Sequence, residues 1–178
     1  HVADKYKEMG YRLGQMIAQA GHNLVYGGAV GGLMTTVAEG AHDAGGNVTG
    51  VVTDHIARHD RQSDVPDSIV TTANLAERKQ VMTELADCFV AMPGGCGTLD
   101  EVFTITAAGI MGEHRKPLYL VNPDGFYDWL LQELAHMKSL RFIPAEESYR
   151  PHVVGSVEEC MEAIAALKPP KGKKAATR

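Results

Sequence analysis

Residues 23–52 read NLVYGGAVGGLMTTVAEGAHDAGGNVTGVV. A short apolar run ends in a glycine-rich turn, a helical pattern follows over about 33–44, and a second apolar run closes the segment. A strand, a helix and a strand in this order, with a connection of this length, are typical of a right-handed crossover between parallel strands. The segment therefore predicts an α/β fold.

The same alternation continues along the chain. Apolar runs predict further strands over about 68–72, 88–92, 117–121 and 152–154, and helical patterns precede Gly21 and begin again near Asn74, Thr98, residue 125 and residue 156. The polar residues 53–68 predict a surface loop. We expect a Rossmann-like, doubly wound parallel sheet with helices on both faces, formed by a single domain over residues 1–167. Since an α/β domain usually begins with a strand, we also expect a first strand before His1.

Composition restricts the class of protein. Of the 178 residues, 44% are hydrophobic and 22% are charged, as in ordinary globular domains. No apolar run approaches the roughly 20 residues that cross a bilayer, so we expect no membrane partner. The three cysteines form no Cys-x-x-Cys pair. They fit a reducing cytoplasm, and predict neither a disulfide framework nor a structural zinc site.

The charge is distributed unevenly. Residues 168–178 carry five basic side chains and no acidic one, whereas the rest of the chain carries 12 basic and 22 acidic side chains. A body this acidic binds nucleic acid poorly, so we do not expect a nucleic-acid partner. The basic tail either extends into solvent as a flexible end, which is the more common case, or touches nucleic acid.

Two strand–glycine–helix junctions are the candidate ligand-binding motifs. They read Tyr26-Gly-Gly-Ala-Val-Gly-Gly-Leu-Met34 and Met92-Pro-Gly-Gly-Cys-Gly-Thr98. Glycines at the carboxyl end of a parallel strand let backbone amides approach an anion, and the following helix adds the positive end of its dipole. Two such turns indicate a phosphorylated ligand; the alternative is that the glycines only form tight turns. Neither turn has the spacing of a Walker loop or of a dinucleotide-binding loop.

Arg78 and Glu101 are the candidate charged residues of this site. Arg78 falls on the apolar side of its predicted helix, so it either faces an anion or extends along the apolar surface to water. Thr98-Leu-Asp-Glu101 has the form of a capping box, so Glu101 either caps its own helix or projects into the crevice beside the glycine turn. The spacing leaves both alternatives open. The apolar residues around Arg78 are Leu75, Val81, Met82 and Leu85.

Two other groups of residues have weaker chemical interpretations. Cys96, in the second glycine turn, is placed for a thiolate at a helix N-terminus, but no histidine is adjacent in sequence and a small filler residue is favoured. His55 and His59 have the spacing of helical metal ligands but lack a third ligand. We therefore expect two solvated histidines and no metal site.

The helix expected over residues 102–111 is apolar nearly all round. Such a helix is either fully buried or covered by another subunit. In a monomer one of its faces would remain as an exposed apolar patch, so this helix predicts a homodimer.

Two motifs together resemble a known family. Arg78-Lys-x-x-Met82 and Pro93-Gly-Gly-Cys-Gly-Thr-Leu-Asp-Glu101 resemble the signature of the LONELY GUY proteins, cytokinin-activating phosphoribohydrolases long labelled lysine decarboxylase-like. The resemblance extends to about residue 167. It implies a Rossmann-like homodimer that hydrolyses the N-glycosidic bond of a nucleoside 5′-monophosphate to a free base and ribose 5-phosphate. This chemistry requires no metal and no cofactor.

The resemblance also assigns residues by position. Arg78 and Glu101 match the family's catalytic pair. Substrate- or phosphate-binding roles are expected for the glycine turns and their neighbours, namely Gly27, Gly28, Gly32, Met34, Lys79, Gly94, Gly95, Gly97 and Thr98.

Some positions depart from the family's pattern. Ala29, Thr35, Ala76, Ala108 and Ile110 stand where the family has other residues, and they cluster where the base or the pocket wall is expected. Adenine from AMP is therefore a safer expectation than a prenylated adenine. The alternative function is a nucleotide or molybdenum-cofactor carrier on the same fold, without turnover.

Overall fold

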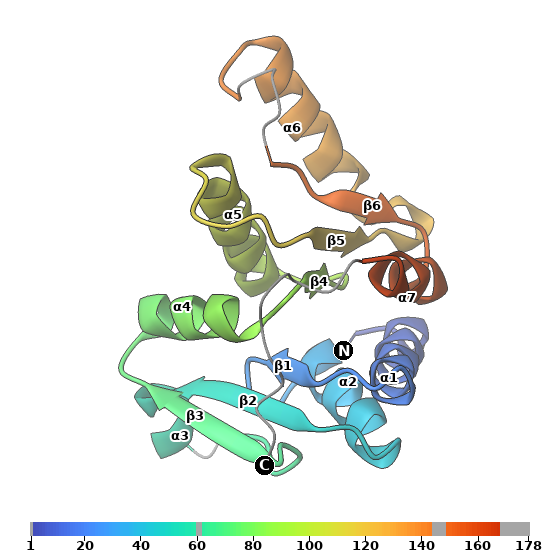
Figure 1. The fold of residues 1–178 in the computed structure, drawn as a ribbon, viewed down its shortest axis with the longest axis vertical. Coiled ribbons are helices and arrows are strands. Elements are labelled where there is room, and N and C mark those ends of the chain that lie inside the picture. Colours follow the sequence, from blue (N-terminus) through green and yellow to red (C-terminus); the bar gives the residue numbers. More distant parts are fainter. Residues whose placement is uncertain (1, 60–61, 144–148, 168–178) are drawn as a thin grey trace.

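The computed structural model describes residues 2–59, 62–143 and 149–167 (Figure 1). Its strands are β1 (Leu24–Tyr26), β2 (Val48–Thr53), β3 (Ser68–Thr72), β4 (Phe89–Ala91), β5 (Leu118–Val121) and β6 (His152–Val154). Its helices are α1 (Asp4–Gln19), α2 (Gly32–Asp43), α3 (Asp54–Arg58), α4 (Leu75–Leu85), α5 (Cys96–Ile110), α6 (Asp128–Ser139) and α7 (Val157–Ala165), with a 3-10 turn at Pro123–Gly125.

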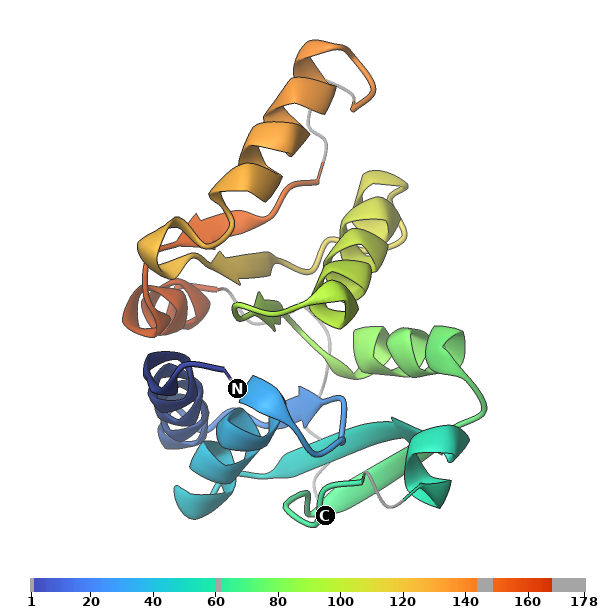
Figure 2. The same ribbon diagram turned by 180° about the vertical axis from the view of Figure 1, so that it is seen from behind.

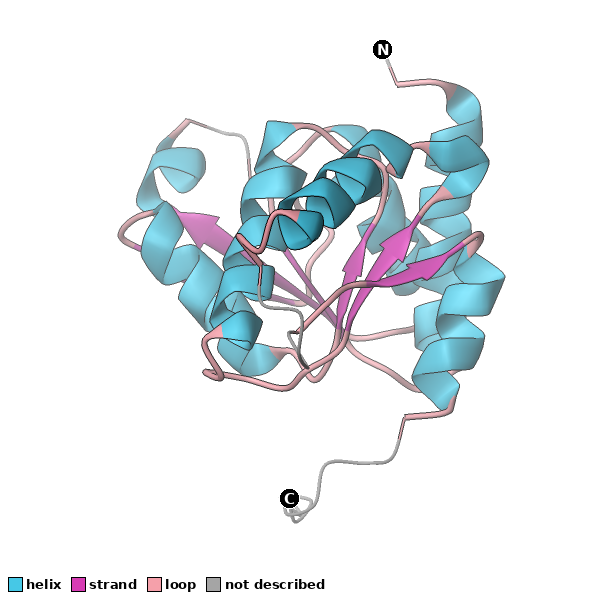
Figure 3. Ribbon diagram, turned by 90° about the horizontal axis from the view of Figure 1, so that it is seen from above, coloured by secondary structure: helices cyan, strands magenta, loops and turns pink. Residues whose placement is uncertain are grey.

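The α/β class predicted from the alternating pattern is confirmed. The ladders between these strands are all parallel, and helices lie on both sides of them (Figure 3). Hydrogen bonds join the strands in two groups of three, β1–β2–β3 and β4–β5–β6. From one end of the molecule to the other the order is β3, β2, β1, β4, β5, β6 (Figures 1 and 2). This is the strand order of the doubly wound fold.

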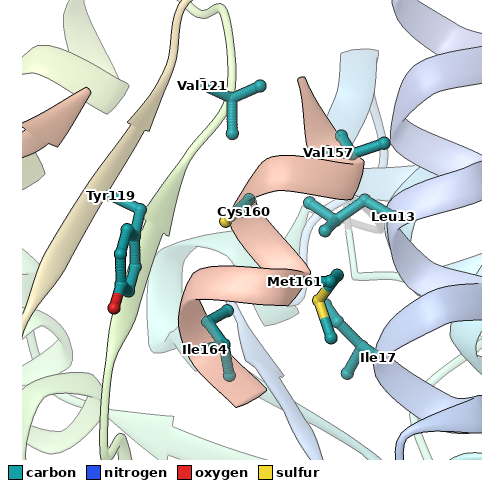
Figure 4. Close-up of a cluster of buried hydrophobic side chains, with 8 residues drawn as sticks. All are labelled: Leu13, Ile17, Tyr119, Val121, Val157, Cys160, Met161 and Ile164. Atoms are coloured by element: carbon teal, nitrogen blue, oxygen red, sulfur yellow. The ribbon is translucent and has the colours of Figure 1, made fainter. Parts of the chain in front are cut away.

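The two groups of strands share their helical layers. One layer contains α1, α2 and α7, and a buried cluster joins α1 and α7 to β5 (Figure 4). The helices α1 and α2 touch along their backbones, because a Cβ built on Gly14 would lie 2.0 Å from the Val37 carbonyl oxygen. The side chains of the cluster are Leu13, Ile17, Tyr119, Val121, Val157, Cys160, Met161 and Ile164.

The polar segment after β2 is not the continuous loop that the sequence predicts. Residues Asp54–Arg58 form the short helix α3. Its start is fixed by Thr53, whose hydroxyl accepts a hydrogen bond from the Ile56 amide at 3.3 Å. Arg58 and Asp54 add an ion pair of 3.7 Å within the helix. A capping threonine at the end of a strand is the signal that the polar composition concealed.

Two further observations concern the membrane and the basic tail. None of the described helices is long and apolar enough to cross a membrane. The basic tail over residues 168–178 lies outside the described residues.

Candidate functional site

Arg78 and Glu101 form an ion pair between α4 and α5. Nη2 of Arg78 lies 3.3 Å from Oε1 of Glu101, and the two side chains are 12% and 33% exposed. Nε of Arg78 donates a hydrogen bond to the Val51 carbonyl oxygen at 3.0 Å. The alternative in which Arg78 extends to water is therefore wrong, because its guanidinium is held inside the crevice by two acceptors.

The position of Arg78 follows from the end of β1. Tyr26, the last residue of β1, pairs with Gly50, so the next residue of β2, Val51, has no partner in β1. Nε of Arg78 donates to the carbonyl of this residue, one position past the last pair of β1 with β2. A buried carbonyl left without a donor would cost about 1–3 kcal/mol, so this hydrogen bond fixes the guanidinium firmly.

Gly27 provides the room for this arrangement. A Cβ built on Gly27 would lie 2.0 Å from Nη2 of Arg78 and 3.3 Å from Sδ of Met34. The turn after β1, Arg78 and Met34 are thus brought together, as the sequence predicted for one site. Gly27 acts there by leaving space for the guanidinium.

The apolar stripe expected around Arg78 is only partly buried. Leu75 and Leu85 are 57% and 46% exposed, and α4 has no fully buried residue. The apolar side predicted for this helix is therefore exposed at both of its ends. The helix instead directs Arg78 inward and leaves its terminal leucines on the surface.

Glu101 is not a partner in a capping box. The helix α5 begins at Cys96 with Gly95 as its N-cap, and no side chain caps it. Thr98 therefore lies inside the first turn, where it cannot serve as the capping residue. Of the two alternatives for Glu101, the structure favours the carboxylate that faces the crevice.

The environment of Glu101 disfavours its charge. Burial raises the pKa of its carboxyl group above the ordinary value, and Asp100 raises it further. Arg78 and Lys79 lower the pKa but do not cancel the effect of burial. A carboxyl group whose pKa is raised holds its proton at a higher pH than an ordinary glutamate, as general acids and bases do.

Lys79 makes a second ion pair beside the first. Its Nζ lies 2.8 Å and 2.9 Å from the two carboxylate oxygens of Asp100. The two consecutive residues of α4 thus hold two consecutive residues of α5. In this structure the Lys79 ammonium contacts Asp100, a partner that the sequence did not indicate, whereas its expected substrate contact stays a prediction.

The second glycine turn leaves the start of α5 open. A Cβ built on Gly95 or Gly97 would meet no atom within 4 Å, so open space lies beside both residues. Gly94 is different, because a Cβ there would lie 2.1 Å from Oγ1 of Thr98. The uncapped amides at this helix end can receive an anion. Glu101 follows them by one helical turn.

The backbone of the first glycine turn makes more hydrogen bonds to the protein itself than the backbone of the second turn does. Gly28 and Gly32 have φ angles of +65° and +56°, a conformation that favours glycine. The Gly28 carbonyl accepts a hydrogen bond from the Ser63 amide at 2.8 Å, and the Gly31 amide donates to Oγ1 of Thr35 at 2.8 Å. Part of this turn is therefore bonded to its own surroundings, and phosphate binding by Gly27, Gly28 and Gly32 stays a prediction.

A tyrosine hydroxyl fixes the residue that follows β4. Tyr127 donates a hydrogen bond from its hydroxyl to the Met92 carbonyl at 2.5 Å. Burial raises the pKa of this hydroxyl to about 12, so it stays a donor at neutral pH. Tyr127 thereby fixes the residue at which the second glycine turn begins.

The weaker chemical candidates of the sequence are Cys96, His55 and His59. Cys96 is exposed at the first residue of α5. His55 and His59 stack with ring centroids 4.3 Å apart on α3 and the residue that follows it. Among the described residues no group of three His, Cys, Asp or Glu side chains is placed to hold a metal ion.

Comparisons of the sequence with a family model and with known proteins point to the same family. A family model described as "Possible lysine decarboxylase" matches residues 34–164. A cytokinin riboside 5′-monophosphate phosphoribohydrolase of Arabidopsis thaliana is 32% identical over 92% of this chain and 72% of its own length. The protein of the same description from Mycobacterium tuberculosis is 33% identical over 89% of this chain and 84% of its own length.

A solved structure shares the fold. The molybdenum cofactor binding protein from Rippkaea orientalis superposes with a TM-score of 0.67 at 27% identity, over 90% of this chain and 86% of that one. The match of the family model to most of the chain and the identity to the two phosphoribohydrolases agree with the signature around Arg78 and Glu101. The chain therefore belongs to the LONELY GUY family, whose family model carries the lysine decarboxylase description.

Proposed function

We propose that this protein hydrolyses the N-glycosidic bond of a nucleoside 5′-monophosphate and releases a free base and ribose 5-phosphate. The observation that carries the proposal is the Arg78–Glu101 pair, which lies one helical turn from the open start of α5. A phosphate at that helix end brings the ribose within reach of the carboxylate. The names of the relatives from Arabidopsis thaliana and Mycobacterium tuberculosis support the same reaction.

The phosphate is held at the second glycine turn. The first-turn amides of α5 have no side-chain cap and face open space at Gly95 and Gly97. Amides at a helix start and the helix dipole together bind a phosphate without any metal ion.

Glu101 acts on the ribose. When the N-glycosidic bond breaks, its electron pair leaves with the base and positive charge develops on the sugar. The carboxylate stabilises this charge and accepts a proton from the water that attacks the anomeric carbon. The raised pKa of Glu101 allows the group to hold that proton and to pass it to the departing base, which leaves with the electron pair of the broken bond.

Arg78 orients this carboxylate and contributes donors of its own. Its hydrogen bond to Val51 and its contact with Glu101 use Nε and Nη2. A guanidinium carries five N–H donors, so others are available to the phosphate or to the departing base.

We propose further that the protein is a cytoplasmic homodimer acting on AMP. Along one face of α5, Phe103 and Met111 are 44% and 77% exposed, with the exposed Ala107 between them. Leu75 and Leu85 add apolar surface on the adjacent α4. The cysteines Cys88, Cys96 and Cys160 are free thiols, which supports a reducing compartment.

A carrier without turnover is the second candidate function. It is favoured by one observation, the likeness of the fold to a molybdenum cofactor binding protein at 27% identity. The Arg78–Glu101 pair favours the hydrolase, because binding alone needs no carboxylate with a raised pKa beside an anion site.

The deciding experiment is incubation with a panel of nucleoside monophosphates, followed by chromatography for the released base. AMP is expected to yield adenine, whereas adenosine, which lacks the phosphate that the α5 amides bind, is expected to stay intact. Binding of a nucleotide with no released base would favour the carrier. Equal turnover of AMP and adenosine would remove the phosphate assignment.

A further inference from the structure

Two peptide carbonyls at the candidate site are held by side chains from neighbouring elements. Nε of Arg78 donates to the Val51 carbonyl at 3.0 Å. The hydroxyl of Tyr127 donates to the Met92 carbonyl at 2.5 Å. Each carbonyl lies just past a parallel ladder, because β1 makes no pair with Val51 and β4 ends its pairing with β5 at Ala91. Arg78 has a role in the proposed reaction, and the matching position of Tyr127 indicates a role for this residue too.

Tyr127 reaches the end of β4 from the turn that follows β5. Asn122 is the first residue after β5, and its side chain spans this turn. Its Oδ1 accepts a hydrogen bond from the Tyr127 amide at 2.6 Å, and its Nδ2 donates to Asp128 at 2.9 Å. Between them the chain reverses through Asp124 and Gly125, whose φ angles are +53° and +72°, a conformation that glycine and aspartate tolerate. Asn122 therefore fixes the point from which the Tyr127 side chain extends.

The ring of Tyr127 is buried between β4 and α5. It is 2% exposed and belongs to the same cluster as Ala91 of β4 and Val102 of α5. Leu99, in the first turn of α5, packs against this cluster as well. A ring enclosed in this way keeps one position, and so does its hydroxyl. Tyr127 thus connects the end of β4 with the beginning of α5, which are the two ends of the second glycine turn.

The path of the second glycine turn depends on hydrogen bonds at its two ends. Pro93 has no N–H to donate, and the two glycines that follow it lack the Cβ that restricts the backbone angles. At the far end the Leu99 amide donates to the Gly95 carbonyl at 3.1 Å, which begins α5. At the near end the Tyr127 hydroxyl holds the Met92 carbonyl. Removal of that hydroxyl therefore frees one end of the turn.

We propose that Tyr127, held by Asn122, is a positioning residue for the phosphate of the substrate. Its hydroxyl sets the path of the second glycine turn, so that the first-turn amides of α5 are in place before the phosphate arrives. This inference rests on the proposed function, in which the phosphate lies at that helix end. A turn that is already held binds an anion without first being ordered, whereas a turn with several paths loses affinity to the cost of ordering. Tyr127 therefore acts on phosphate affinity, and Glu101 acts on the bond that breaks.

A second tyrosine provides a matched control. The hydroxyl of Tyr149 donates to the Lys116 carbonyl at 2.7 Å, and its ring packs against the same apolar cluster. Burial raises the pKa of both tyrosine hydroxyls, so both stay donors at neutral pH. The Tyr149 ring lies against Gly109, where a built Cβ would be 2.3 Å from its Cγ. Gly109 is in the last turn of α5, roughly 20 Å from the start of the helix. Loss of this hydroxyl therefore removes the same kind of hydrogen bond far from the phosphate turn.

The test compares Tyr127→Phe, Tyr149→Phe and the wild type. Titration calorimetry with ribose 5-phosphate measures affinity without turnover, and steady-state kinetics with AMP give KM and kcat. In Tyr127→Phe we expect the Kd for ribose 5-phosphate and the KM for AMP to rise roughly 10-fold, with kcat within about 2-fold of the wild type, since the net worth of one hydrogen bond corresponds to about that factor. Tyr149→Phe should keep all three constants. Both variants should lower the Tm by a similar amount.

Asn122→Ala tests the same path from the other side. It removes the acceptor of the Tyr127 amide and leaves the ring and its hydroxyl in the chain. We expect it to raise the Kd for ribose 5-phosphate in the same direction as Tyr127→Phe does. In the double variant it should add nothing to the loss caused by Tyr127→Phe, because both changes act through the Met92 carbonyl.

The outcomes separate this inference from the proposed function. Tyr127 is a structural residue only if its Phe variant keeps the wild-type Kd for ribose 5-phosphate, or if the Kd rises equally in Tyr149→Phe. A fall in kcat at unchanged Kd would contradict the inference as well. If Tyr127→Phe does not fold, the Kd of Asn122→Ala decides in the same way. A wild type that binds ribose 5-phosphate but releases no base from AMP removes the hydrolase and leaves the comparison of Kd values in force, whereas a wild type that does not bind ribose 5-phosphate removes both.

Discussion

Arg78 and Glu101 meet at 3.3 Å although they belong to different helices, α4 and α5, and lie 23 positions apart in the sequence. Their contact depends on the backbone carbonyl of Val51, which fixes the guanidinium, and on the glycine turn that makes room for it. The pair is therefore part of the fold as well as of the proposed chemistry, and the two roles can be separated by substitution.

Replacing Glu101 with glutamine tests the carboxylate. Glutamine retains an oxygen that accepts the Arg78 hydrogen bond, but it removes the charge that faces the developing cation. We expect the rate of base release to fall by about 10²–10⁴-fold while the Tm changes little. The matched control is Glu84→Gln on the exposed side of α4, which should keep full activity. A Glu101→Gln variant that releases base at the wild-type rate would show that the carboxylate takes no part in the reaction.

The raised pKa of Glu101 also predicts a pH dependence of stability. Because the folded state binds this proton more tightly than the unfolded state, the carboxyl group lowers stability as pH rises from about its ordinary value of 4.5 through the folded pKa. Below that window the wild type and Glu101→Gln should differ in Tm by a constant amount. Above it the difference should shift in favour of the glutamine variant. A Tm difference that is flat from pH 4 to pH 8 would contradict the raised pKa.

The Lys79–Asp100 pair predicts non-additive effects on stability. Each of the variants Lys79→Met and Asp100→Asn should lower the free energy of unfolding by at most about 1 kcal/mol, since Asp100 is half exposed. The double variant should cost no more than the larger single change. Denaturant titration of all four proteins measures this. If Lys79→Met alone raises KM for AMP, its substrate-binding role is supported instead.

The apolar face of α5 predicts how the dimer can be broken. Phe103→Lys and Met111→Lys place charges on this face, and we expect the mass measured by light scattering at micromolar concentration to halve. Trp129→Lys is the control, because Trp129 is 82% exposed and belongs to another helix, α6. Wild-type protein that is already monomeric at this concentration would remove the dimer.

The sequence was sufficient for the features that repeat along the chain. Apolar runs between glycine turns predicted the parallel α/β fold. The two turns indicated a candidate site, and its role in binding stays a prediction. The start of α5 was misplaced, because in a run of glycines a helix can begin at any of several residues, and Thr98 imitated a cap. The anchor of Arg78 could not be predicted at all, since a backbone carbonyl at Val51 leaves no mark in the side-chain pattern.

Ion pairs between two helices could not be predicted from the sequence either. In the sequence Asp100 appears only as a member of the Thr98–Glu101 motif, and only the packing of α4 against α5 brings it to Lys79. The glycine at position 27 was predicted to matter, but for a different reason. Sequence favours phosphate binding at a glycine turn, whereas the structure shows the guanidinium of Arg78 occupying the space that a side chain would need.

Gly27→Ala tests that reason directly. The φ angle of Gly27 is not among the positive ones, so alanine fits the backbone and the change acts only through the added Cβ. That atom would lie 2.0 Å from Nη2 of Arg78 and must displace the guanidinium. We expect kcat/KM for AMP to fall about 10²–10³-fold, close to the loss caused by Arg78→Ala.

A double-mutant cycle separates this coupling from damage to phosphate binding. If Gly27 acts by making room for Arg78, then adding Gly27→Ala to the Arg78→Ala enzyme costs nothing further, because the clashing group is already gone. If Gly27 instead holds the phosphate, the two losses multiply. Gly155→Ala, where the nearest atom would be the flexible Glu159 carboxylate at 3.3 Å, controls for a glycine replacement remote from the site. If the two losses of kcat/KM multiply, Gly27 binds the phosphate, and the hydrogen bond to Val51 alone positions Arg78.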